Sequence, residues 1–134
     1  MRAGLVQREP ERLAKWYADG LYEQIQKRRE GAERFLLHDG PPFANGDVHI
    51  GTALNKILKD FILKYQSLRG KQVPYVPGWD CHGLPIEFKV TQKMRKEGNT
   101  DATPAVIRKA CEEYALAFVD KQREQFKRLG VLGE

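Results

Sequence analysis

The sequence predicts an α/β fold that is incomplete within its 134 residues. Two short apolar runs, residues 34–38 and 72–76, predict strands because Gly and Pro residues bound them. Longer segments with apolar residues three and four positions apart predict helices between and after these runs. The order strand, helix, strand, helix, helix suits parallel strands joined by crossover helices. A sheet of two strands is too small to bury both of its faces, so we expect further chain or a partner to complete it.

A helical extension is predicted for residues 1–32. Pro10 is expected to open a short helix that Asp19 and Gly20 close, since proline favours the first helical position. A second short helix is expected over residues 21–29, before Gly31.

The clearest helix is predicted over residues 48–69. We expect Asp47 to cap its start and Gly70 to stop it. Its nine apolar positions are expected to face the core: Ile50, Ala53, Leu54, Ile57, Leu58, Phe61, Ile62, Tyr65 and Leu68. The charged positions on the other side are expected to face solvent: Lys56, Lys59, Asp60 and Lys64.

Two more helices are predicted in the second half of the chain. The first lies within residues 84–96 and has Pro85 in its first turn. The second begins with Thr103 as its cap and Pro104 as its first residue, and Gly130 ends it. Its apolar stripe is Ile107, Ala110, Cys111, Tyr114, Phe118, Phe126 and Leu129.

The composition excludes several classes of protein. With 41% hydrophobic and 31% charged residues the chain is globular rather than disordered, and no apolar run reaches the length of a membrane span. No secretory signal is visible, so we expect a cytoplasmic location and reduced thiols at Cys81 and Cys111. Two cysteines cannot build a four-ligand zinc site, and no metal site is predicted. The net charge of +5 suits nucleic-acid binding, but solvated helix surfaces give the same figure.

The segment over residues 38–52 carries the chemistry, because a strand, a Gly- and Pro-rich loop and a helix start follow one another there. A helix N-terminus attracts phosphate through its free N–H groups and its dipole. His49 and Thr52 share one face of the first turn and both can donate hydrogen bonds, while Gly51 lets a ligand approach the backbone. An ordinary helix start with a surface histidine remains the alternative. Residues 70–72 do not complete a P-loop, because Gln follows Gly-Lys.

Residues 42–52, Pro-Phe-Ala-Asn-Gly-Asp-Val-His-Ile-Gly-Thr, resemble the His-Ile-Gly-His signature region of the class I aminoacyl-tRNA synthetases. Residues 38–42, 54–60 and 77–87 narrow the resemblance to the isoleucyl members of that family. It covers about residues 10–132. The resemblance implies the first half of a Rossmann-like nucleotide-binding catalytic domain over residues 33–134, ending about where the family inserts its editing domain.

The family activates L-isoleucine with ATP and Mg²⁺ to isoleucyl-adenylate and then transfers the aminoacyl group to tRNA(Ile). The resemblance implies an ATP site made of Pro42, Asn45, Gly46, His49, Gly51 and Thr52. His49 and Thr52 would hold the triphosphate as charge builds on it. Thr52 stands where the family has its second signature histidine, and its hydroxyl donates one hydrogen bond and carries no charge.

The resemblance also implies an amino-acid site. Asp80 would pair with the substrate's ammonium group, and Gly40 and Pro41 would line the pocket for its side chain. From the residues alone, Asp80 could equally cap the helix expected near Leu84. Trp79 is expected to pack rather than to contact substrate.

The family's Lys-Met-Ser-Lys-Ser loop and anticodon-binding region are not found in these residues, so we expect little or no aminoacylation by the isolated chain. Two alternatives remain open. A small nucleotidylyltransferase uses a similar helix start but leaves residues 78–83 unexplained. A catalytically dead module that binds nucleotide or tRNA is the other. If the chain is part of a synthetase, the remainder of the synthetase chain is an expected partner.

Overall fold

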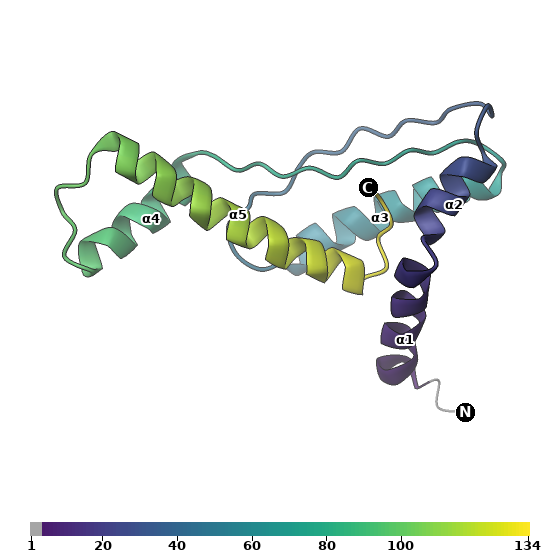
Figure 1. Ribbon diagram of the computed structural model, residues 1–134, viewed down its shortest axis with the longest axis horizontal. Coiled ribbons are helices and arrows are strands. Elements are labelled where there is room, and N and C mark those ends of the chain that lie inside the picture. The colour runs from purple at the N-terminus through teal and green to yellow at the C-terminus, as the bar shows by residue number, and fades with distance from the viewer. Residues whose placement is uncertain (1–3) are drawn as a thin grey trace. The chain divides into compact units, whose positions relative to one another are not determined.

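The computed structural model describes residues 4–134, and most of them are helical (Figure 1). The helices in order are α1 (Leu5–Ala18), α2 (Leu21–Arg28), α3 (Ile50–Leu68), α4 (Leu84–Lys96) and α5 (Pro104–Arg128). The chain divides into two compact units. Unit 1 contains residues 4–39, His49–Pro77 and Gln125–Glu134, and unit 2 contains Gly40–Val48 and Gly78–Glu124.

The two expected strands are extended segments rather than strands of a sheet. Within residues 4–134 they share one isolated parallel bridge, Arg34 with Gln72 in unit 1, and a second, Phe43 with Asp80 in unit 2, lies in the loops that follow them. The parallel direction agrees with the prediction, but the α/β sheet is not formed within these residues. A physical reason is that prolines, which have no N–H to donate, interrupt the second segment at Pro74 and follow the two segments at Pro41, Pro42 and Pro77.

The N-terminal helices differ in part from the prediction. Pro10 does not open α1, which begins at Leu5 and carries the proline inside it. Pro10 is the sixth residue of α1, beyond the first turn, so its missing N–H costs the helix one internal hydrogen bond. The expected second helix is confirmed as α2, which ends at Arg28.

The start of α3 was predicted at the wrong cap. His49 is the N-cap, and its side chain accepts hydrogen bonds from the backbone of the first turn. Asp47 instead forms an ion pair with Lys121, with Nζ and Oδ1 2.7 Å apart. The predicted end is confirmed, because Gly70 follows Arg69 with a positive φ of 96°.

The two faces of α3 are reversed relative to the prediction. Lys56 and Asp60 are buried, at 2% and 5% exposure, and Leu63 is buried beside them. The expected core positions are largely exposed: Ile50, Leu54, Leu58, Phe61, Ile62, Tyr65 and Leu68. The charged face turns inward because unit 1 supplies partners for its charges. No part of residues 4–134 covers the apolar face.

The partner for these charges is Asp39, at the end of the first extended segment. Lys56 and Lys59 of α3 both donate hydrogen bonds to its carboxylate, and the Tyr75 hydroxyl donates a third over 2.7 Å. Lys56 Nζ also lies 5.4 Å from the centre of the Phe126 ring, within range of a cation–π interaction. Further along α3, Lys64 pairs with Asp60 and donates to the Gly130 carbonyl over 2.8 Å. Unit 1 therefore combines these paired charges with buried apolar side chains: Leu63, Val73, Phe126 and Val131.

Unit 2 has an apolar core. Trp79, Met94 and residues of α5 pack against this core. Its five buried residues are Ala44, Ile86, Val90, Ala115 and Val119. The predicted starts of both helices are confirmed. Pro85 lies in the first turn of α4, and α5 begins at Pro104 after Thr103, whose Oγ1 accepts from Val106 N–H over 3.5 Å.

Helices long and apolar enough to cross a membrane do not occur within residues 4–134.

Candidate active site

The first turn of α3 is closed by its own capping histidine. His49 Nδ1 accepts from the N–H groups of Gly51 and Thr52, over 3.1 and 3.3 Å. Since Nδ1 accepts, a neutral ring carries its proton on Nε2, which lies 3.1 Å from Thr52 Oγ1. The sequence led us to expect free N–H groups at this helix end. The imidazole of His49 instead caps the N–H groups of Gly51 and Thr52. His49 and Thr52 do share one face of the turn, as predicted.

Gly51 has a steric role in this arrangement. A Cβ added at this position would lie 3.0 Å from His49 Cε1 and 3.2 Å from Nδ1. That is closer than carbon atoms normally approach one another. A side chain at residue 51 would therefore push the imidazole out of its capping position, so glycine permits the cap as well as access to the backbone.

In unit 2, the loop that contains residues 40–48 is paired through its backbone with the loop that contains residues 78–83. Asp80 N–H donates to the Pro42 carbonyl, and Ala44 N–H donates to the Asp80 carbonyl, each over 2.9 Å. Ala44 is completely buried beneath this pairing. The residue proposed to bind the substrate ammonium and the Gly-Pro-Pro loop are thus adjacent, although they lie far apart in the sequence.

The Asp80 side chain is not a helix cap, because α4 is capped by Gly83. Its Oδ1 accepts from the His82 N–H over 3.3 Å, and the His82 imidazole Nδ1 lies 3.8 Å away. The Asp80 side chain is 29% exposed. A carboxylate held by its neighbouring loop and still accessible to solvent can accept an ammonium group.

Gln122 of α5 joins the two loops and was not predicted from the sequence. Its Nε2 donates to the carbonyls of Phe43 and Gly46, over 2.9 Å each, and its Oε1 accepts from Trp79 Nε1 over 3.0 Å. Only 3% of Gln122 is exposed. The signal was present, because a glutamine occupies the position between Val119 and Phe126 where the helical stripe calls for an apolar residue. The packing role expected for Trp79 is consistent with this contact.

The other predicted residues of the first loop differ in how they are held, and Asn45 is bound by α5. Asn45 Oδ1 accepts from the Tyr114 hydroxyl over 2.9 Å, and burial raises the pKa of that phenol. Gly46 is at a positive φ of 98°, where a side chain would be strained. Gly40 and Pro41 are exposed, and a Cβ added at Gly40 would touch no other atom within 4 Å. The small size of Gly40 is therefore not required by packing within the chain.

The structure gathers the predicted residues into two groups. His49, Gly51 and Thr52 lie together in unit 1. The members of the second group all lie in unit 2: Gly40, Pro41, Pro42, Asn45, Gly46 and Asp80.

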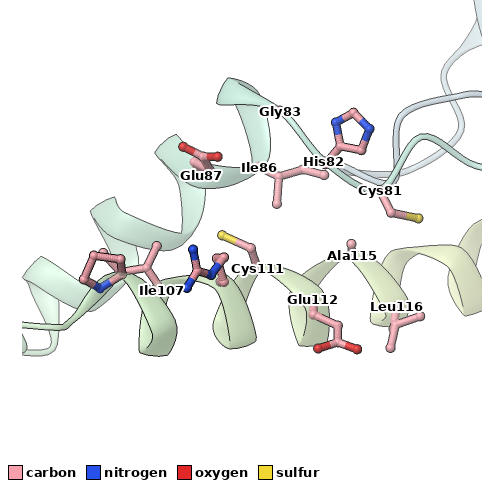
Figure 2. Close-up of a pocket in the computed structure, with 12 residues that line it drawn as sticks. Cys81, His82, Gly83, Ile86, Glu87, Ile107, Cys111, Glu112, Ala115 and Leu116 are labelled. Carbon is pink, nitrogen blue, oxygen red and sulfur yellow. The ribbon is translucent and has the colours of Figure 1, made fainter.

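A cavity of about 670 Å³ in unit 2 begins at Cys81, the residue after Asp80 (Figure 2). Its lining combines apolar side chains with charged groups from both helices: Glu87 of α4, and Arg108 and Glu112 of α5. Figure 2 shows the sulfur of Cys111 pointing toward α4, and burial, with a smaller contribution from Glu87, raises the pKa of this thiol. Among the described residues, no three His, Cys, Asp or Glu side chains are grouped as metal ligands.

Comparison with known proteins places this geometry in a family. Residues 11–134 match the family model of tRNA synthetases class I (I, L, M and V). Isoleucine–tRNA ligases from Zymomonas mobilis, Alkalilimnicola ehrlichii and Methylococcus capsulatus are 59%, 60% and 58% identical, each over 100% of the chain. The chain spans only 15%, 14% and 14% of those relatives. It therefore belongs to the class I tRNA synthetases.

Proposed function

We propose that this chain is the first part of the catalytic domain of an isoleucine–tRNA ligase. That enzyme would activate L-isoleucine with ATP and pass the aminoacyl group to tRNA(Ile) in the cytoplasm. The observation that carries the proposal is identity of 58–60% to isoleucine–tRNA ligases along the entire chain. The backbone pairing of the Gly-Pro-Pro loop with Asp80 supports it, because both proposed parts of the amino-acid site then lie side by side.

ATP would bind with its triphosphate at the first turn of α3, with Mg²⁺ accompanying it. The phosphate oxygens would replace the His49 ring as acceptors for the N–H groups of Gly51 and Thr52, and the displaced ring could then donate to the triphosphate. Thr52 would donate one further hydrogen bond. Pro42, Asn45 and Gly46 are assigned to ATP binding because they belong to the same signature segment of the sequence. Such a site accelerates adenylate formation by positioning and by stabilising negative charge, without a protein nucleophile.

Isoleucine would bind with its ammonium group at Asp80. A charge-assisted hydrogen bond to a carboxylate is stronger than a neutral one, and this fixes the amino acid for attack on the α-phosphate. Gly40 and Pro41 would form the wall beside the side chain of the substrate. Gly40 supports this assignment, because its small size leaves space that none of residues 4–134 occupies.

The remainder of the synthetase would cover the apolar face of α3. Seven large apolar side chains along α3, from Ile50 to Leu68, are exposed, and a contiguous apolar stripe of this kind is typical of a surface that another part of a protein covers. We assign residues 33–134 to the first half of the catalytic domain and residues 1–32 to an N-terminal extension. The 134 residues alone would then have little or no aminoacylation activity.

The test is ATP–pyrophosphate exchange by the full-length protein that contains this sequence. Exchange that depends on isoleucine, and that neither leucine nor methionine supports at the same concentration, is the expected result. Exchange without an amino acid but with a phosphorylated acceptor would indicate a nucleotidylyltransferase instead. Tight binding of ATP or tRNA without any exchange would indicate a non-catalytic binding module.

A further inference from the structure

The cluster formed by Asp39, Lys56, Lys59 and Tyr75 has more charge than a structural contact in a protein interior requires. Its carboxylate is 6% exposed, and the side chains of Lys56 and Lys59 are 2% and 20% exposed. Each lysine bonds a different oxygen of Asp39. Tyr75 donates to Asp39 over 2.7 Å and accepts from Lys56 over 3.1 Å. All of its members lie in unit 1.

The protonation states follow from these contacts. Burial alone would raise the pKa of Asp39, but the hydrogen bonds from Lys56, Lys59 and Tyr75 outweigh it and hold the pKa below its ordinary value. Burial, together with the neighbouring carboxylate of Asp39, raises the pKa of Tyr75. Asp39 is therefore a carboxylate and Tyr75 a neutral phenol near pH 7. Apolar residues could hold the same space at equal or lower free energy, so stability alone does not account for so many buried charges.

The cluster lies on the face of α3 that also carries the proposed nucleotide site. At about 100° per residue, the seven residues from His49 to Lys56 make nearly two full turns, so the two residues share one side of the helix. Thr52 and Lys59 point within roughly 60° of the direction of Lys56 around the helix axis. The contact between α3 and Asp39 therefore fixes the rotation of α3 about its own axis, and with it the direction of the first turn.

We propose that Asp39 is a positioning residue for nucleotide binding, which holds α3 through Lys56 and Lys59 so that His49 and Thr52 face the triphosphate. The proposal rests on the function proposed above. Asp39 would not touch ATP. Its effect would be on the orientation of the groups that do.

The experiment uses the full-length protein and two matched variants, Asp39→Asn and Asp60→Asn. Asp60 is also a buried carboxylate paired with a lysine, and it lies on α3 itself, eleven residues beyond His49. Exchange kinetics are measured for ATP and isoleucine separately, together with the melting temperature of each variant. We expect Asp39→Asn to lower kcat, or kcat/KM for ATP, at least tenfold and to change KM for isoleucine less than twofold. Asp60→Asn should lower the melting temperature by a similar amount but change the exchange kinetics less than twofold.

A conservative rescue separates positioning from simple loss of structure. Lys59→Arg should keep kcat within threefold of the wild type, since arginine can still donate to Asp39, whereas Lys59→Met should lose activity as Asp39→Asn does. Equal kinetic losses in Asp39→Asn and Asp60→Asn, or wild-type kinetics in a folded Asp39→Asn protein, would overturn the proposal.

A second readout decides the proposal even if the function proposed above is wrong. A wild-type protein without isoleucine-dependent exchange would refute that function. Amide hydrogen exchange of residues 51–56 would then be compared in the same variants. Faster exchange in Asp39→Asn than in Asp60→Asn supports the positioning of α3 by Asp39. Equal exchange refutes it.

Discussion

Asp80 and Gln122 are the two residues of unit 2 with the most specific proposed roles. Asp80 offers a partly exposed carboxylate whose backbone is fixed by Pro42 and Ala44. Gln122 is buried and satisfies three polar groups from two loops at once. One residue is thus proposed to meet the substrate, and the other holds the loops that present it.

The first residue-scale prediction concerns substrate binding. In the full-length protein, Asp80→Ala should raise KM for isoleucine by about 100-fold, the effect of losing a charge-assisted hydrogen bond of about 3 kcal/mol. KM for ATP should change by less than threefold. Steady-state ATP–pyrophosphate exchange measures both. Equal rises in the two constants would remove the role assigned to Asp80.

The second concerns stability. Gln122→Leu should lower the free energy of unfolding by about 2–4 kcal/mol, because the carbonyls of Phe43 and Gly46 and the Trp79 N–H lose a buried partner. Gln92→Leu, at an exposed position of α4, serves as the control and should change it by less than about 0.5 kcal/mol. Chemical denaturation measures the difference. A cost for Gln122→Leu no larger than that of the control would contradict the bridging role.

At the scale of elements, α3 shows what the sequence could and could not establish. Apolar residues at helical spacing predicted the helix and both of its ends to within two residues. They gave the wrong buried face, because periodicity identifies two faces but not which one a neighbour covers. Asp39 decided the outcome, since a carboxylate at the end of an extended segment could pair with Lys56 and Lys59. The position of that carboxylate depends on tertiary structure, which spacing along one helix does not report.

The exposed face of α3 leads to a prediction at this scale. In the full-length protein, Phe61→Ser should lower the free energy of unfolding by about 2–4 kcal/mol, as expected for a large apolar side chain in a core. Phe61 is 63% exposed in this chain, so the loss would come from contacts with the remainder of the protein. Val6→Ser on α1, which starts 76% exposed, should cost less than about 0.5 kcal/mol. Similar small costs for both would mean that nothing covers α3.

The cluster at Asp39 predicts a pH dependence. Because its folded pKa lies below the ordinary value of 3.8, Asp39 contributes stability above that value, and the contribution is lost as the pH falls through the folded pKa. The melting temperature of the wild type should therefore exceed that of Asp39→Asn at pH 6, and the gap should narrow as the pH falls below about 4. Thermal melts from pH 7 to pH 3 measure the gap. A gap that stays constant over this range would show that the charge of Asp39 does not matter.

For the whole molecule, the sequence identified the candidate site residues but not the contacts that hold them. The candidate site residues were identified because residues 42–52 resemble the signature region of the class I aminoacyl-tRNA synthetases, in a loop that Gly and Pro mark before a helix. Their supports were not found, since Gln122, Tyr114 and Asp39 act across long separations in the chain. The expected sheet is reduced to two parallel bridges, and the remaining six-sevenths of the curated relatives' length would supply its other strands.

The central claim is that Asp80 binds the ammonium group of the substrate and that the first turn of α3 binds phosphate. A crystal structure of the full-length protein with a non-hydrolysable isoleucyl-adenylate analogue tests it most directly. We predict the ammonium group of the analogue on the Asp80 carboxylate and its phosphate replacing the His49 ring at the N–H groups of Gly51 and Thr52. An analogue that binds without touching Asp80, or that leaves the His49 cap in place, would contradict this account.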